Sequence, residues 1–191
     1  MKVNYISKFT LAAFALATIV SCGKKNKTVD PPKDEVEVNI PCSGPDYWTD
    51  KNNFRANALG ESIDRMTAKK KAMSNARAQM AADIQTTMKV VGDNYVNSTE
   101  FNNKEEITET FQENARTVVD QVISGTSTIC EKTTMNKTTG KYTTYVAIEL
   151  NSDELVSKYN ERLSSDERIK AEYNYEKFKE TFEKEMAKIG G

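Results

Sequence analysis

The chain has 191 residues, with 27 Lys and Arg against 28 Asp and Glu, which leaves a formal net charge of -1 at pH 7. Because a domain that binds nucleic acid usually carries a clear basic excess, this balance argues against a nucleic-acid partner. The sequence contains no histidine, so it lacks the side chain best suited to proton transfer near neutral pH and the commonest metal ligand. We therefore expect no catalytic residues, no metal and no cofactor.

The segment 1–21 has the composition of an export sequence. Lys2 and Lys8 give a basic start, residues 9–20 form an uncharged apolar run, and Ser21 stands directly before Cys22. The apolar run is too short to cross a hydrocarbon core, which needs about 20 apolar residues. A basic start, a short apolar centre and small residues at its end are typical of a secretory signal peptide.

With a cysteine directly after the small residues, this segment resembles a bacterial lipoprotein signal peptide. The resemblance implies cleavage before Cys22 and acylation of Cys22, so that N-terminal acyl chains hold the protein in a membrane. The alternative is an ordinary signal peptide or a short anchor that happens to end at a cysteine. No Asp follows Cys22 and no acidic cluster resembles a surface-export sequence. By analogy, we expect the outer membrane, with the protein facing the periplasm.

A tether is expected between Cys22 and the folded part of the chain. Residues 30–35 are charged and include two prolines, a composition that cannot bury a core. Residues 36–40 alternate in polarity and predict a short edge strand. Once Cys22 is acylated, Cys42 and Cys130 are the remaining thiols, and an even pair in an exported protein predicts a disulfide. The alternative is two thiols that never meet.

A strand and a long helix are predicted next. Residues 54–61 alternate between small or apolar and polar side chains, which favours a strand. From Asp64 to about Val91, apolar residues recur three, four and seven positions apart, as in an amphipathic helix, and Gly92 is expected to end it. This helix carries a methionine-rich row of Met66, Met73, Met80, Ile84 and Met88, beside a row of small residues at Ala68, Ala72 and Ala76.

A second helix and a β-hairpin follow. Residues 105–122 predict the helix, whose buried stripe is expected to comprise Ile107, Phe111, Ala115, Val118 and Val122. Residues 125–135 and 141–150 are rich in Thr, Ile, Val and Tyr and are separated by a five-residue loop that ends in Gly140. Two such runs around a glycine-containing loop indicate a hairpin.

The C-terminal region predicts two more helices, one from residue 151 to Leu163 and one from Asp166 to Ile189. A capping-box spacing at residues 164–167 marks the expected start of the second one. The last helix carries an apolar stripe of Tyr175, Phe178, Phe182 and Met186 on an otherwise charged surface. This stripe either packs on its own domain or forms an interaction site for a second copy or another partner.

These elements predict an α+β fold, with an antiparallel sheet of three or four strands, two long helices on one face and a C-terminal helical extension. The predicted organisation is a signal peptide over residues 1–21, a lipidated tether over 22–45, an α+β domain over 46–150 and the helical extension over 151–191.

Residues 54–62 are followed by Ala68, Ala72, Ala76-Arg77 and Met80-Ala81, and the hairpin contains Gly125-Thr126-Ser127 and Tyr145-Val146-Ala147-Ile148. This pattern resembles a family of Helicobacter-type outer-membrane lipoproteins of about twenty kilodaltons, which includes a flagellar basal-disk lipoprotein. The resemblance covers about residues 45–150. It implies a small α+β domain at the cell envelope with no established catalytic chemistry.

Three further groups of residues have both a functional and a structural interpretation. Asp46, Tyr47, Trp48 and Asp50 could line a ligand site, although packing of Trp48 on the sheet edge is preferred. The methionine row suits core filling better than metal binding. Four glutamates at positions 105, 106, 109 and 113 are best explained as a solvated helix face.

The sequence thus predicts a lipid-anchored envelope protein with a structural or interaction role, in contact with itself, with peptidoglycan or with another envelope protein. The alternative is a lipoprotein that binds a small ligand in the periplasm.

Overall fold

The computed structural model describes residue 36 and residues 38–189. The predicted signal peptide, Cys22 and most of the tether lie outside this range. A compact unit begins at Asn39 and runs to the C-terminus, and every residue of the hydrophobic core lies within it. This unit therefore contains all the packing on which its folding depends.

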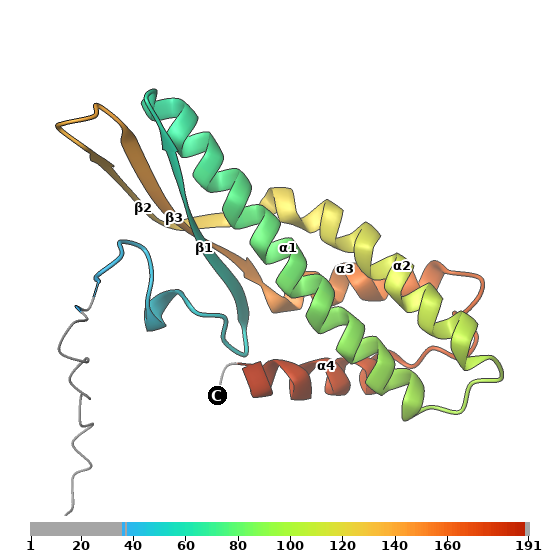
Figure 1. Cartoon of the computed structure of the whole chain (residues 1–191). Coiled ribbons are helices and arrows are strands. Elements are labelled where there is room, and N and C mark those ends of the chain that lie inside the picture. The colour runs from blue at the N-terminus through green and yellow to red at the C-terminus, as the bar shows by residue number, and fades with distance from the viewer. Residues whose placement is uncertain (1–35, 37, 190–191) are drawn as a thin grey trace, which may run out of the picture. The chain divides into compact units, whose positions relative to one another are not determined.

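The described residues form the predicted α+β fold (Figure 1). Two short 3-10 helices, η1 (Pro45–Tyr47) and η2 (Ile123–Gly125), accompany the main elements. In chain order, these are β1 (Asn53–Ser62), α1 (Arg65–Asn97), α2 (Lys104–Val122), β2 (Ser127–Met135), β3 (Tyr142–Asn151), α3 (Ser152–Ser165) and α4 (Tyr175–Ile189).

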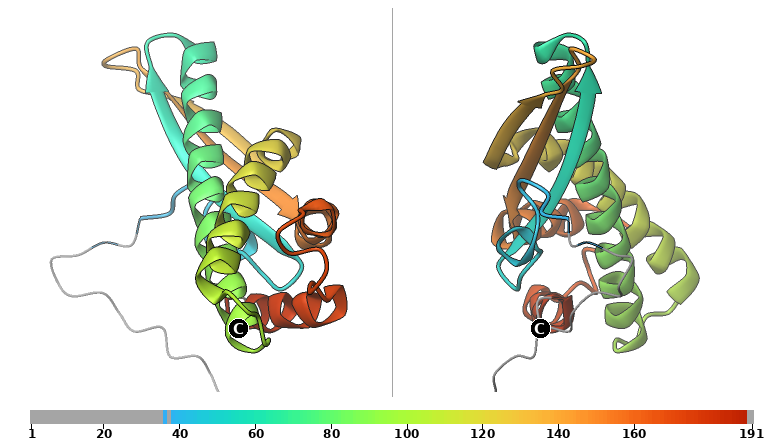
Figure 2. Two further views of the ribbon diagram at one scale, coloured as in Figure 1. Left: turned by 90° about the vertical axis from the view of Figure 1, so that its right-hand side faces the viewer. Right: turned by 60° about the vertical axis from the view of Figure 1, so that its left-hand side comes forward.

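The sheet is antiparallel, in the order β1-β3-β2. The predicted hairpin is confirmed, and Gly140 in its loop has a φ of 68°, a conformation that glycine adopts without steric cost. Phe54, Ala56 and Ala58 of β1 lie opposite Leu150, Ile148 and Val146 of β3. These six side chains share the face of the sheet that α1 covers (Figure 2).

The first half of α1 packs on this face at very short range. A Cβ atom added at Gly60 of β1 would overlap the backbone oxygen of Ala68 and the backbone nitrogen of Ala72. Ala68, Ala72 and Ala76 are fully buried. The predicted row of small residues is therefore the contact line between the helix and the sheet.

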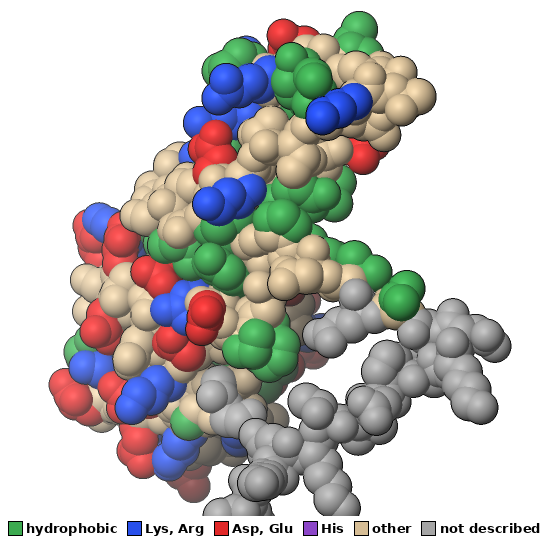
Figure 3. All heavy atoms as spheres, turned by 90° about the vertical axis from the view of Figure 1, so that its left-hand side faces the viewer, with side chains coloured by type: hydrophobic (Ala, Val, Ile, Leu, Met, Phe, Trp, Pro, Cys, Tyr) green, Lys and Arg blue, Asp and Glu red, His purple; other side chains and the backbone are tan. Residues whose placement is uncertain are grey.

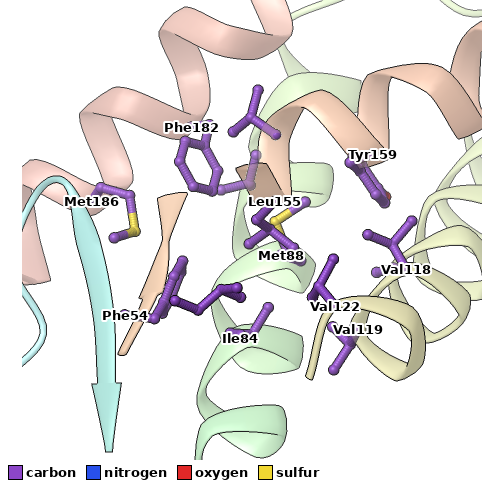
Figure 4. Close-up of a cluster of buried hydrophobic side chains, with 14 of the residues drawn as sticks. Phe54, Ile84, Met88, Val118, Val119, Val122, Leu155, Tyr159, Phe182 and Met186 are labelled. Carbon is purple, nitrogen blue, oxygen red and sulfur yellow. The ribbon is translucent and has the colours of Figure 1, made fainter. Parts of the chain in front are cut away.

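The second half of α1 extends past the sheet, because 33 helical residues span about 50 Å whereas ten strand residues span about 33 Å. Larger side chains, including Met80, Ile84 and Met88, replace the alanines on the buried stripe. They meet α2, α3 and α4 in the main core (Figure 4).

The predicted helix end at Gly92 is wrong, since α1 continues to Asn97. Gly92 is buried, and an added Cβ there would lie 3.3 Å from Cβ of Phe111 in α2. This glycine lets two helices approach each other closely and does not stop the first one. The predicted α2 is confirmed, with all five residues of its expected stripe buried.

The segment before β1 lies on the other face of the sheet, where Cys42 forms a disulfide with Cys130 of β2. Arg55 of β1 donates hydrogen bonds to Asp50 Oδ2 at 2.8 Å and to Glu149 Oε2 at 2.6 Å. It also donates one to the backbone oxygen of Trp48 at 3.1 Å. The predicted disulfide is therefore present, and an ion-pair network fastens the same segment near β1.

Two other predictions are wrong. The described residues between positions 36 and 40 form no strand. The last helix begins at Tyr175 rather than Asp166, because Asp166 ends α3 instead. Its backbone N–H bonds to the oxygen of Leu163, and its carboxylate accepts hydrogen bonds from Asn114 and Arg168. These bonds, above all those from Arg168, hold the pKa of Asp166 well below its usual range.

Replacing Gly60 by alanine tests the helix–sheet contact. The added methyl group must push backbone against backbone, so we expect Gly60→Ala to lower the free energy of unfolding by about 3 kcal/mol or more. Gly125→Ala is the matched control, because an added Cβ there meets only a Glu154 carboxylate oxygen at 4.0 Å. Chemical denaturation of both variants measures the effect, and equal stabilities would contradict the proposed contact.

Removal of the disulfide tests the attachment of the N-terminal segment. The bond links residues 88 positions apart, and a cross-link that closes a loop of this size typically contributes about 2–5 kcal/mol. We expect Cys42→Ser and Cys130→Ser each to destabilise the protein by this amount in denaturant titrations. A reductant should destabilise the unmutated protein equally and leave both variants unchanged. A reductant effect on either variant would argue against this pairing.

Candidate interaction surface

The C-terminal apolar stripe is not available to a partner. Phe178, Phe182 and Met186 are buried in the domain's own core, and Tyr175 is partly buried against it. Figure 4 shows Phe182 and Met186 pointing from α4 toward Phe54 of β1. Of the two interpretations of this stripe, the interaction site is therefore wrong and docking on the same domain is confirmed.

An aromatic cluster explains why α4 docks. The ring of Phe178 lies 5.2 Å from Tyr159, 5.8 Å from Tyr95 and 6.0 Å from Phe111, centroid to centroid. The hydroxyl of Tyr159 donates a hydrogen bond of 2.5 Å to the backbone oxygen of Phe111. Residues from α1, α2, α3 and α4 thus form one continuous core, and the predicted C-terminal extension is part of it.

The other candidate residues separate from one another in the structure. Trp48 does not pack on the sheet edge as expected, since 62 % of its surface is exposed. Met80 and Met88 fill the core, while Met66 lies on the surface. Glu113 forms an ion pair with Arg168 at 2.9 Å, and the α2 glutamates are not gathered around any cavity that the structure describes.

The hollows found on the described surface are open to solvent. One of them lies between α1 and α2, has a volume of about 290 Å³ and is lined in part by Lys89 and Arg116. Across residues 36 and 38–189, no group of three or more His, Cys, Asp or Glu side chains is placed to hold a metal ion. Within the same residues, no helix has the length and apolar character needed to span a membrane.

The described surface is strongly divided by charge. We define the tip as residues 60–77 and 131–143, which comprise the end of β1, the start of α1 and the β2–β3 hairpin end (Figure 1). The tip carries eight Lys and Arg against three Asp and Glu, a net charge of +5. We define the base as residues 98–122 and 152–189, which carry ten Lys and Arg against sixteen Asp and Glu, a net charge of -6.

The ion pairs are also distributed unequally between the tip and the base. Within the part of the chain that the structure describes, Lys69 is the one tip cation in an ion pair, with Glu131 at 2.8 Å. Six base cations form ion pairs with nearby carboxylates. Asp64 caps α1 by accepting a hydrogen bond from the Thr67 N–H, which lowers the pKa of the Asp64 carboxyl. The other tip cations form no ion pair with a described carboxylate.

Apolar side chains stand among these cations. Ile63 is 78 % exposed, Met66 57 % and Met135 51 %. Ser62 and Met135 both lie opposite Tyr142 in the sheet, which brings the β1–α1 turn next to the hairpin end. Figure 3 shows basic and hydrophobic side chains side by side at the upper end of the molecule. The tip is therefore a basic surface with protruding apolar groups.

Sequence reasoning misses this surface because its two segments are far apart along the chain and neither has an unusual net charge alone. The run Lys69-Lys70-Lys71 is visible in the sequence, but its position within a helical pattern indicates only the polar side of that helix. The antiparallel register of the sheet brings Lys132, Lys137 and Lys141 to the same end.

Comparisons of this chain with protein-family models, with curated proteins and with solved structures found no match.

Replacing Phe178 by alanine tests the docking of α4. Loss of a buried aromatic side chain typically costs about 3–5 kcal/mol, and Phe178 is fully buried. We expect Phe178→Ala to lower the free energy of unfolding by this amount in denaturant titrations without changing the molecular mass in solution. Lys184→Ala on the exposed side of α4 should have an effect below about 0.5 kcal/mol. Dissociation of an oligomer by Phe178→Ala at unchanged stability would restore the interaction interpretation.

Proposed function

We propose that this protein is a lipid-anchored component of a bacterial cell envelope with a structural or interaction role. In this proposal, acyl chains on Cys22 hold it in the outer membrane with the domain facing the periplasm. Two or more acyl chains are enough for stable anchoring, whereas one gives only marginal binding.

The observation that carries the proposal is the disulfide between Cys42 and Cys130. Disulfides persist in oxidising compartments such as the bacterial periplasm and are rare in the cytosol. A bridge of this kind supports export of the domain, which is what the segment before Cys22 predicts. It also attaches Cys42, which lies 20 residues after Cys22 in the sequence, to β2 of the domain.

The order of elements gives further support. The resemblance to the Helicobacter-type lipoproteins implies a strand, a long helix, a second helix and a hairpin, and the chain has these elements in this order. Membership of that family is part of the proposal and rests on residues 54–62, on the alanine row and on the hairpin.

An interaction role suits the described surface better than the alternative of small-ligand binding. Small-molecule sites are concave and enclose most of the ligand, whereas the hollows described above are open. The tip instead offers exposed charge and exposed apolar side chains on a projecting end, which is the kind of surface that contacts a large partner.

Substitution of Cys22 tests the anchor. If Cys22 is acylated, Cys22→Ser should move the protein out of the membrane fraction or leave it unprocessed. Mass spectrometry of the unmutated N-terminal peptide should show a diacylglyceryl group. Cys42→Ser is the matched control, since it removes a cysteine without removing the lipid, and it should stay in the membrane fraction. An intact N-terminus with residues 1–21 still attached to the mature protein would contradict the proposal.

A further inference from the structure

We propose that the tip binds the surface of a bilayer that contains anionic phospholipids, as a second membrane contact in addition to the lipid anchor. The ligand groups are lipid phosphates and the acyl chains just below them. The choice of this partner rests on four features of the tip: its unpaired cations, its lysine content, its exposed apolar side chains and its position relative to the disulfide.

The first feature is the charge that remains available for a partner. Arg65, Lys70, Lys132, Lys137 and Lys141 are exposed, and none of them forms an ion pair with a described residue. Each basic residue near an anionic bilayer contributes about 1 kcal/mol to binding. The cations of the base are instead largely compensated by their own carboxylates, so the base offers no comparable attraction.

The second feature separates a lipid partner from a protein partner. Six of the eight tip cations are lysines. Lysine is depleted in protein–protein interfaces, where arginine and aromatic residues are enriched. Lysine-rich clusters beside apolar side chains are instead typical of surfaces that adsorb to anionic membranes.

The third feature is the presence of apolar groups at the extremity. Ile63 belongs to the turn between β1 and α1, and Met135 ends β2 at the same end of the sheet, on the other side of Tyr142 of β3. A convex end with exposed Ile and Met side chains surrounded by cations can insert these side chains among lipid head groups while the lysines contact phosphates. Such insertion removes apolar side-chain surface from water, which favours binding.

The fourth feature is geometric and rests on the proposed acylation of Cys22. The disulfide fixes Cys42 to Cys130, and the strand from Cys130 to Met135 spans about 17 Å. The stretch of chain from Cys22 to Asn39 can extend to at most about 60 Å. The chain is therefore long enough for the lipid and the tip to lie in the same membrane surface.

The charge of the base sets the orientation. With the tip on an anionic surface, the base, at a net charge of -6, would be repelled from it. Docking by the tip would thus direct α2, α3 and α4 away from the bilayer.

Vesicle co-sedimentation tests the proposal with residues 23–191, which contain the complete compact unit but not Cys22. The probes are vesicles of phosphatidylglycerol and phosphatidylethanolamine at one to three, with phosphatidylcholine vesicles for comparison. We expect binding to the anionic vesicles only, and its loss at about 0.5 M salt, because screening shortens the range of the charges.

The decisive variant combines Lys70→Glu, Lys137→Glu and Lys141→Glu, which should weaken vesicle binding on the order of 100-fold. The matched control combines Lys158→Glu, Lys170→Glu and Lys184→Glu in the base, which makes the same change in net charge and should bind as the parent does. A third variant, Ile63→Ser with Met135→Ser, should weaken binding on the order of 10-fold and leave its salt dependence unchanged. Circular dichroism of each variant checks that the fold is intact.

Equal binding of the tip and base variants, or equal binding to both kinds of vesicle, would overturn the proposal. Association of the protein with itself in the absence of vesicles, lost in the tip variant and kept in the base variant, would assign the tip to the acidic base of a second copy instead and would also overturn it. This assay does not involve Cys22, so a negative result would not contradict the proposed lipid anchor. A negative result of the Cys22 experiment would likewise not change what the vesicle assay says about the tip.

Discussion

The close contact between β1 and the first half of α1 is the constraint on which the rest of this structure depends. Gly60 has no side chain to hold the two backbones apart, and the buried alanines at positions 68 and 72 face it from α1. Because α1 is longer than the strand against which its first half packs, its second half extends beyond the sheet. Only there is space available for large side chains, and α2, α3 and α4 gather around it.

This arrangement gives the domain two ends with different physical properties. The base contains the aromatic cluster and most of the large core residues, so its surface can be charged without loss of packing. At the tip, only α1 and the sheet pack on each other, and the side chains between them are small. This end has no core that could bury apolar residues such as Ile63 and Met66, and they remain exposed. Exposed apolar groups beside unpaired cations are thus a consequence of how thin the tip is.

The disulfide and the Arg55 network link this domain to its N-terminal segment at a defined place. A tether that met the domain at a flexible terminus would transmit no orientation. Here, residues 42–50 are fastened across the face of the sheet that the helices leave open, by Cys130 on one strand and by Arg55 on another. A membrane contact through the tip would then act together with the proposed lipid anchor, since attachment at one site raises the effective concentration of the other site at the same surface.

The sequence by itself determined the secondary structure of most of the chain, because hydrophobic periodicity and turn residues are local properties. The hairpin around Gly140, the buried stripe of α2 and the small-residue row of α1 all follow from spacing alone. The pairing of Cys42 with Cys130 was one of two alternatives at that level. Only the tertiary structure could show that the two cysteines meet across the sheet.

The tertiary structure also decided every feature that depends on distant residues. The local sequence predicts that Gly92 ends a helix, but in the structure Gly92 lies against Phe111 and lets two helices approach closely. The local sequence also predicts that Asp166 starts a helix, but in the structure its carboxylate accepts hydrogen bonds from Asn114 and Arg168. The stripe on α4 fits a free surface and a docked one equally well until its neighbours are known. The tip has no counterpart in the linear sequence, because an antiparallel register brings together lysines from two distant segments and the local pattern of each segment carries no information about the other.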